Sequence, residues 1–159
     1  MTVMIRRPDI GYLPTELGTV KALLALAEIQ PTDVIYDLGS GDGRVVIQAA
    51  QQFGVRGVGI DIDPVRIQDA QEKAKQAGVS YLVEFRQADL YTANVQDATV
   101  VVLYLLPHLN LRLRPRLLEQ LAPGTRLLSH QFDMGDWPPD RVVTVQGEEE
   151  ESILYRWQL

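Results

Sequence analysis

Residues 37–44 read Asp-Leu-Gly-Ser-Gly-Asp-Gly-Arg, and this stretch decides the fold. It follows the short apolar run Val34–Leu38 and precedes a segment, 43–53, in which apolar residues recur at helical spacing. Glycines in such a connection let the backbone turn tightly and let main-chain N–H groups approach a ligand without a Cβ in the way. The stretch is therefore predicted to join a buried strand to a helix beside a bound ligand.

Strands and helices are predicted to alternate on both sides of this loop. Further strands are expected at 55–62, 81–86, 99–106 and 126–132, and helices at 15–30, 64–77 and 110–121. Pro115 is expected in the first turn of the last helix or at a kink. Alternation indicates a parallel sheet with helices on both faces, and a hairpin formed by 141–146 and 152–158 adds an antiparallel edge.

Composition narrows the classes of function. The 159 residues carry a net charge of −6, so a protein that grips nucleic acid through its phosphates is not expected. The absence of cysteine excludes disulfide scaffolds and thiolate zinc sites, and with two histidines no metal site is expected. No apolar run is long enough for a signal peptide or a membrane span, so a cytoplasmic protein is expected. One domain over 1–159 is predicted, with an N-terminal segment and helix in 1–30 and the core sheet in 31–159.

Two acidic residues follow the next predicted strands. Asp61 ends the strand at 55–62, 22 residues beyond Gly39, where a carboxylate can accept hydrogen bonds from two ribose hydroxyls. Asp89 follows the third strand, where a carboxylate can reach an adenine amino group. Each acid alone could cap a helix, and each glycine could serve a turn. Because both acids and the loop fall at carboxyl ends of strands, the sequence predicts a nucleotide-type ligand.

The loop favours S-adenosylmethionine over a dinucleotide. Arg44 stands where the dinucleotide fingerprint has its third glycine. Asp37 would repel a pyrophosphate but suits a ligand with a cationic amine. An NAD-dependent reductase is the alternative.

The loop, together with Gly59-Ile60-Asp61-Ile62-Asp63-Pro64 and Ala88-Asp89-Leu90, resembles the class I (seven-β-strand) S-adenosylmethionine-dependent methyltransferases. The resemblance implies a Rossmann-like, doubly wound α/β sheet with strand order 3-2-1-4-5-7-6 and strand 7 antiparallel. Tyr12-Leu13-Pro14-Thr15, Leu103-Tyr104-Leu105-Leu106-Pro107 and residues 124–137 look like a small bacterial group. That group is similar to the seven-strand protein-lysine methyltransferases.

The resemblance also implies roles for individual residues. Asp37 and the loop would hold the methionine part, Asp61 the ribose and Asp89 the adenine amine, while Ile62 would pack on the adenine face. Tyr12 and Thr15 would form a lid over the methionine end; alternatively, Tyr12 is a surface aromatic and Thr15 a helix N-cap. The implied cofactor-binding residues are Tyr12, Thr15, Asp37, Gly39, Ser40, Gly41, Gly43, Asp61, Ile62, Ala88, Asp89 and Leu90.

The acceptor side is less defined by the sequence. Tyr104, His130 and Asp133 are the candidate catalytic residues, because they follow or end the fourth and fifth strands. Tyr104 could instead close the core, and His130 could be a buried, hydrogen-bonded residue. The predicted reaction is methyl transfer to a nucleophile, with a protein lysine amine as the first choice and a small molecule as the second. A non-catalytic S-adenosylmethionine-binding protein is a further alternative.

Charge patterning bears on the acceptor. The run Glu148-Glu149-Glu150-Glu151 is typical of a solvated turn, but it could also steer a basic protein substrate. Arg112, Arg114 and Arg116 keep RNA methylation open as an alternative through a local basic surface. The oligomeric state is not predicted.

Overall fold

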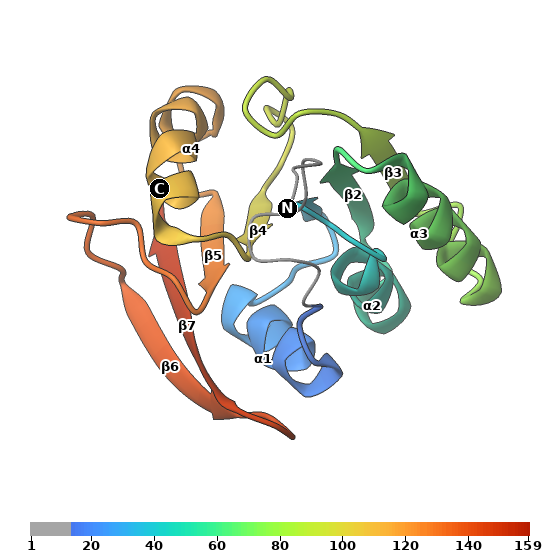
Figure 1. Cartoon of the computed structure of the whole chain (residues 1–159), viewed down its shortest axis with the longest axis horizontal. Helices are drawn as coiled ribbons and strands as arrows, with labels where there is room; N and C mark the ends of the chain where they lie inside the picture. Colours follow the sequence, from blue (N-terminus) through green and yellow to red (C-terminus); the bar gives the residue numbers. More distant parts are fainter. Residues whose placement is uncertain (1–13) are drawn as a thin grey trace, which may run out of the picture.

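The computed structural model describes residues 14–159, which form a seven-stranded sheet with four helices (Figure 1). The strand order is β3-β2-β1-β4-β5-β7-β6; β1 to β5 pair in parallel, while β7 is antiparallel to both β5 and β6. This confirms the predicted doubly wound fold. The elements are α1 (Leu17–Ala27), β1 (Val34–Leu38), α2 (Arg44–Phe53), β2 (Arg56–Asp61), α3 (Pro64–Gln76), β3 (Val83–Gln87), β4 (Val100–Leu103), α4 (Pro107–Gln120), β5 (Arg126–His130), β6 (Arg141–Gln146) and β7 (Glu151–Gln158).

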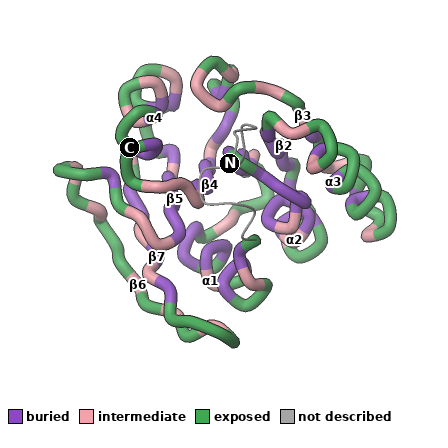
Figure 2. The backbone as a smooth tube through the Cα atoms, in the orientation of Figure 1, coloured by how far each residue is buried: buried purple, intermediate pink, exposed green. Residues whose placement is uncertain are grey.

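The helices divide unequally between the two faces of the sheet. Alternate side chains of a strand point to opposite faces, so Ile35 joins the core under α1, α2 and α3, while Tyr36 joins the core under α4. The central strands β1 and β4 are buried on both faces, whereas β6 forms an exposed edge (Figure 2). Because β1 pairs in parallel with both β2 and β4, the carboxyl ends of these three strands lie together at one edge of the sheet.

Local sequence explains where α2 and α3 begin. Gly43 precedes α2 with φ of 81°, and a Cβ at this position would lie 2.7 Å from the Phe85 ring and 3.0 Å from Ala70. Only glycine allows both that backbone angle and that close approach of the loop to β3 and α3. The Asp63 carboxylate caps α3 by accepting a hydrogen bond from Val65 N, and Pro64 fills the first helical position.

Pro115 and Thr15 each depart from one of the places expected for them. Pro115 is the ninth residue of α4, because the helix begins at Pro107; it therefore lies outside the first turn, and a kink at this position stays a prediction. Pro115 and Leu111, whose carbonyl loses an N–H partner, are both exposed, so water can replace the missing hydrogen bond. Thr15 is not the N-cap of α1: Glu16 holds that position without a capping side chain, and the Thr15 hydroxyl turns inward to His130.

None of the helices in the described part of the chain is long and apolar enough to cross a bilayer.

Candidate active site

The glycine loop at 39–43 is fastened to the end of β2. The amides of Gly39 and Ser40 donate to the Ile60 carbonyl oxygen at 2.8 and 3.0 Å, and Gly41 N donates to Asp61 Oδ2 at 2.9 Å. Gly43 N donates to the Ser40 carbonyl oxygen at 2.9 Å. The sequence had assigned these amides to the methionine part of the cofactor, yet all four donate within the protein. These bonds hold the loop in shape, and the contact of its residues with the cofactor stays a prediction.

Asp61 joins the loop to the neighbouring strand ends. Besides accepting from Gly41, its carboxylate accepts from Asp63 N at 2.9 Å, and its carbonyl oxygen accepts from Ala88 N at 3.0 Å. A carboxylate has about four acceptor positions, so each of its two oxygens retains capacity for a further donor. The buried Asp61 is thus fixed in orientation and can still accept hydrogen bonds from a diol.

Asp37 is a buried carboxyl in an acidic neighbourhood. Burial, followed by the negative charges of Asp61 and Asp42, raises the pKa of Asp37 well above its usual range. Among residues 14–159, neither a hydrogen bond nor a cation counters this rise in the pKa of Asp37. A cation placed beside it would relieve the repulsion among these carboxylates.

The negative charge of Asp42 is balanced by neighbouring cationic side chains. Burial alone would raise its pKa, but hydrogen bonds and charge from Arg44 and Lys73 outweigh burial and lower it. Arg44 Nη2 and Lys73 Nζ lie 2.8 and 3.0 Å from Asp42 Oδ2. Arg44 also donates to the Thr15 carbonyl oxygen at 3.0 Å. Asp42 therefore ties the loop to α2, to α3 and to the start of α1.

The residues predicted to border the adenine are exposed or half-buried. Ile62 is 56% exposed, so its side chain is accessible to a flat apolar partner. Ala88 and Leu90 are half-buried. Asp89 is exposed, and its carboxylate accepts a hydrogen bond from Tyr91 N at 2.9 Å, which fixes it in a turn.

The predicted acceptor side gathers residues from four distant segments. His130, at the end of β5, has Nδ1 3.0 Å from Thr15 Oγ1 and Nε2 2.9 Å from Ser152 Oγ. Its ring centroid lies 4.0 Å from that of Tyr104, which directly follows β4. Burial lowers the pKa of His130 to about 4, against a smaller opposing effect of Glu16. The imidazole is therefore neutral at pH 7.

The three candidate catalytic residues do not form one cluster. Tyr104 contacts His130 and also lies 6.3 Å, between ring centroids, from Phe132. Burial, then the charge of Glu150, raises the pKa of Tyr104. Asp133 is exposed, and its carboxylate accepts from Gly135 N at 3.1 Å, so it shapes the turn after β5. Tyr12 lies outside the described residues.

Sequence reasoning missed two buried polar residues. Ser152 shares an inward face of β7 with the buried Leu154, so a polar residue at a core position of the predicted strand was the available signal. Asn110 is fully buried on α4, and its Nδ2 donates to the carbonyl oxygens of Phe132 and Asp133 at 3.3 and 3.1 Å. Asn110 therefore holds the turn after β5 in place.

The arginines of α4 are used by the protein. Arg114 donates to the Met134 carbonyl oxygen at 3.1 Å and pairs with Asp136. Arg116 donates to the carbonyl oxygens of Thr92 and Ala93 at 2.9 and 3.1 Å. The Arg112 guanidinium lies 3.9 Å from the centre of the Tyr91 ring. These side chains attach the loops after β3 and β5 to α4, which weakens the idea of a basic surface reserved for RNA.

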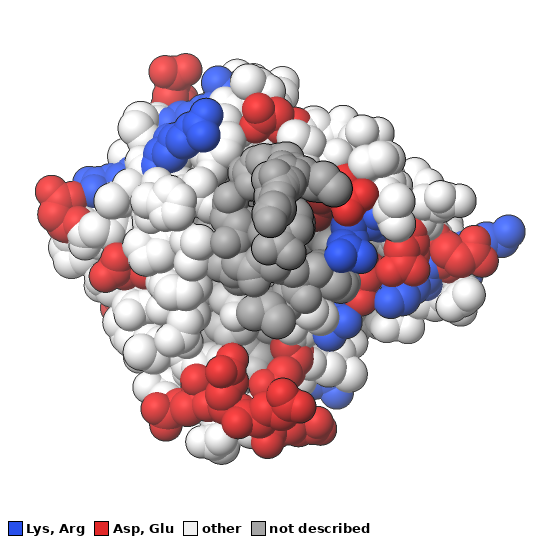
Figure 3. Space-filling model, in the orientation of Figure 1, with Lys and Arg blue, Asp and Glu red and all other residues white. Residues whose placement is uncertain are grey.

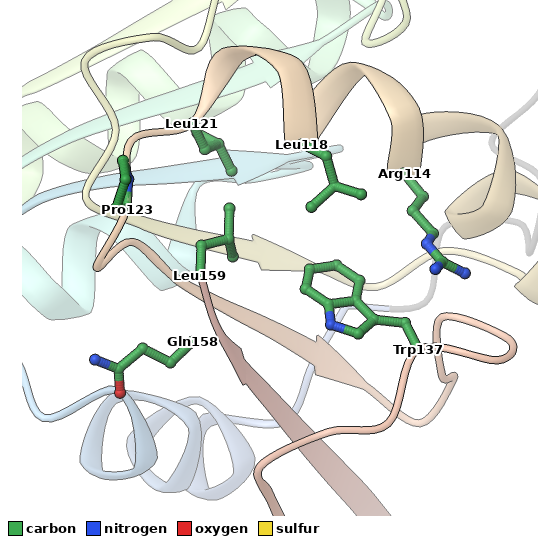
Figure 4. A pocket seen from close by; sticks show the side chains of 7 residues that line it. All are labelled: Arg114, Leu118, Leu121, Pro123, Trp137, Gln158 and Leu159. Atoms are coloured by element: carbon green, nitrogen blue, oxygen red, sulfur yellow. The ribbon is translucent and has the colours of Figure 1, made fainter.

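A hollow of about 400 Å³ lies elsewhere, between α4 and the end of β7 (Figure 4). Arg114, Leu118 and Leu121 border it on the side of α4, and Trp137 and Leu159 face them. None of the predicted cofactor or catalytic residues lines it. It is therefore separate from the site at the strand ends.

Comparison with known proteins decides the family. The family model described as the ANTKMT methyltransferase domain matches residues 37–141, from the first residue of the loop to the start of β6. The chain belongs to this methyltransferase family. It is an S-adenosylmethionine-dependent methyltransferase, which confirms the predicted enzyme class and cofactor.

Similar proteins include both protein and RNA methyltransferases. The methyltransferase is 35% identical over 149 residues to a protein-lysine N-methyltransferase of Saccharolobus islandicus, covering 93% of this chain and 92% of that protein. It is 33% identical to the adenine nucleotide translocase lysine N-methyltransferase of Mus musculus over 86% of this chain, but spans only 59% of that protein. A solved RNA methyltransferase from Salinibacter ruber, in complex with S-adenosyl-L-homocysteine, is 55% identical with a TM-score of 0.88, covering 92% of this chain and 93% of that one.

Proposed function

We propose that this methyltransferase transfers a methyl group from S-adenosylmethionine to the ε-amine of a protein lysine. The observation that carries the proposal is an acidic rim beside the aromatic residues of the acceptor side. The acidic rim consists of Glu16, Glu148, Glu149, Glu150 and Glu151. The name of the relative from Saccharolobus islandicus supports the same acceptor.

The acidic rim is built from the start of α1 and the turn between β6 and β7. Glu16 Oε1 accepts a hydrogen bond from Glu148 N at 2.6 Å, which brings the two segments together. Figure 3 shows the acidic side chains gathered at the tip of the β6–β7 hairpin, at the lower edge of the view. Glu150 contributes to the raised pKa of Tyr104, and Glu16 acts on the pKa of His130, so the rim is electrostatically coupled to both aromatic rings. Such a surface attracts a lysine-rich segment.

The cofactor roles are assigned to side chains at the strand ends. Asp37 would hold the ammonium of the methionine part, because it is buried, repelled by two other carboxylates and unpaired within the described residues. Asp61 would accept from the ribose hydroxyls, while Ile62 and the residues 88–90 would border the adenine. When bound, the cofactor supplies a methyl group on a positive sulfur, which becomes a neutral thioether once the methyl is displaced.

The protein would orient the acceptor and partly shield it from water. The lone pair of the lysine nitrogen must lie in line with the bond between sulfur and methyl, which makes orientation the main source of rate. The lysine must also arrive as the neutral amine. Tyr104 and His130 form an aromatic wall at the proposed acceptor site. We assign the Tyr104 hydroxyl of this wall to a hydrogen bond with the lysine amine. His130 keeps its ring nitrogens engaged by Thr15 and Ser152, so it supports the wall rather than accepting a proton.

Labelled transfer to a cell extract tests the acceptor class. The purified protein is incubated with extract and S-adenosylmethionine labelled in its methyl group, and the product is divided between protease and ribonuclease treatment. Label that protease releases, and that ribonuclease leaves intact, supports the proposal. Label confined to small molecules contradicts it, and so does tight cofactor binding without transfer.

RNA is the second candidate acceptor, because a 55% identical protein of known structure bears the name RNA methyltransferase. The net charge of −6 and the engagement of Arg114 and Arg116 by protein groups count against it. Label that ribonuclease releases from the extract would favour RNA over lysine.

A further inference from the structure

The His130 ring is held at both of its nitrogens by hydroxyls from opposite ends of the chain. Thr15 precedes α1 and is 115 residues away in sequence; Ser152 lies on β7. All three residues are buried, at 7%, 4% and 3% exposure for Thr15, His130 and Ser152. A half-turn of the imidazole would put carbon atoms against both hydroxyls and leave two buried polar groups without partners, which costs free energy at each. The two hydrogen bonds therefore hold the ring in one orientation.

The fixed ring is the surface on which Tyr104 lies. Their centroids are 4.0 Å apart and their planes differ by 31°. Tyr104 follows the last residue of β4, so its backbone is anchored by the sheet while its side chain depends on neighbours for its orientation. Because the His130 ring cannot turn, it restricts the Tyr104 ring to a narrow range of positions.

Thr15 also connects this surface to the cofactor loop. Its carbonyl oxygen accepts a hydrogen bond from Arg44 Nη1 at 3.0 Å, and Arg44 in turn is bonded to Asp42 in the loop. Thr15 is thus linked to the loop through its carbonyl oxygen and Arg44, and to the aromatic wall through its hydroxyl. A displacement of its main chain would alter both the loop and the position of His130.

We propose that Thr15 and Ser152 are positioning residues, which orient Tyr104 toward the methyl acceptor through the His130 ring. The inference rests on the proposed function in one respect, namely that Tyr104 faces the acceptor amine. It adds that β7, an element remote from the cofactor loop in sequence, sets the geometry of transfer through a single hydroxyl.

This arrangement is tested by comparing variants that remove each hydroxyl with variants that keep it. Thr15→Val and Ser152→Ala remove the two hydroxyls, while Thr15→Ser and Ser152→Thr retain them; Thr144→Val removes an exposed hydroxyl from β6 as a control. We expect kcat to fall about tenfold in each removal variant, because small misplacements of reacting groups cost rate steeply. The KM for the acceptor and the affinity for S-adenosylhomocysteine should change less than twofold, by about the same small factor as in Thr144→Val. The retention variants should recover most of the kcat that the removal variants lose, and Thr144→Val should keep the wild-type kcat.

A double-mutant cycle and a spectroscopic measurement separate positioning from general damage. In a Tyr104→Ala background, Ser152→Ala should cause no further loss of kcat. By proton NMR, the His130 ring signals should be shifted by the Tyr104 ring current in the wild type, and should move toward those of the exposed His108 in both removal variants. An unchanged kcat, a loss that persists in full without Tyr104, or unchanged His130 signals would each overturn the proposal. The NMR result stands whether or not lysine is the acceptor, so it distinguishes this inference from failure of the proposed function.

Discussion

The proposed cofactor side and the proposed acceptor side of this methyltransferase are built in different ways. The cofactor side is made of strand ends that are adjacent in the sheet, and its glycine loop is bonded to β2 by Gly39, Ser40 and Gly41. The acceptor side joins the start of α1, the ends of β4 and β5, and β7, through the side chains of Thr15, Tyr104, His130 and Ser152. Local backbone geometry defines the first side, and long-range contacts of side chains define the second.

The largest expected effect is on the loop itself. Gly43→Ala would place a Cβ 2.7 Å from the Phe85 ring at a residue with φ of 81°. Crowding and the left-handed backbone together should lower the free energy of unfolding by about 3 kcal/mol. Gly54→Ala is the control, because φ is 68° there but the space is open, so about 1 kcal/mol is expected. Denaturant titration measures both, and equal losses would show that the contact with Phe85 is unimportant.

The next largest effect concerns Asp61. Asp61→Ala removes the acceptor for Gly41 N as well as the proposed ribose contact. We expect S-adenosylhomocysteine to bind more weakly by about 2 kcal/mol, or about thirtyfold, because hydrogen bonds to charged groups are stronger than neutral ones. Calorimetric titration measures the affinity. Asp63→Ala should leave the affinity unchanged and cost about 1 kcal/mol of stability through the lost helix cap; an unchanged affinity in Asp61→Ala would mean that the ribose contact is misplaced.

Asp37 should show opposite effects on stability and on cofactor binding. Its folded-state pKa is raised, so the folded protein binds a proton more tightly than the unfolded chain, and stability falls as pH rises from the ordinary aspartate range through the raised pKa. Asp37→Asn should therefore stabilise the cofactor-free protein at pH 8 and weaken S-adenosylhomocysteine binding about tenfold.

The same residue predicts proton release on cofactor binding. The cofactor ammonium favours the charged carboxylate, so in the wild type affinity should fall as the pH is lowered, and calorimetry in buffers of different ionisation enthalpy should detect a released proton. Asp37→Asn should abolish the release. A wild-type affinity independent of pH, with no proton released, would remove Asp37 from the ammonium site.

The smallest effect is expected from the acidic rim. Changing Glu148, Glu149, Glu150 and Glu151 to glutamine should raise the KM for a lysine-rich substrate about threefold at low salt and have no effect at high salt, because the interaction is steering through solvent. Changing Glu72 and Glu119, which are exposed on α3 and α4, to glutamine should leave this KM unchanged at low and at high salt. Equal KM values for the two sets at low salt would exclude a role of the rim in recruitment.

The contrast between the two sides also explains what the sequence could predict. The alternation of strands and helices, the terminal hairpin and the places of Asp37 and Asp61 follow from local patterns, because parallel strands bring their carboxyl ends to one edge. The strand order came from the family resemblance, and the folded sheet has that order. The inward turn of Thr15 depends on its contact with His130, which lies 115 residues away in sequence. The proposed role of Ser152 depends on its contact with the same histidine, 22 residues away. No local pattern encodes such pairs, and a short hydroxyl residue before a helix normally indicates a cap. The internal use of the loop amides likewise depends on the position of Ile60 in the folded sheet.

Identification of the methylated atom tests the central claim most directly. Acceptor labelled by the enzyme from cell extract is hydrolysed to its monomers, and the labelled species is identified by mass spectrometry. We predict that the label is carried by lysine methylated at Nζ, and that the Tyr104→Ala variant loses this product while retaining affinity for S-adenosylhomocysteine. Label recovered in a methylated nucleoside, or in no lysine derivative at all, would contradict the account.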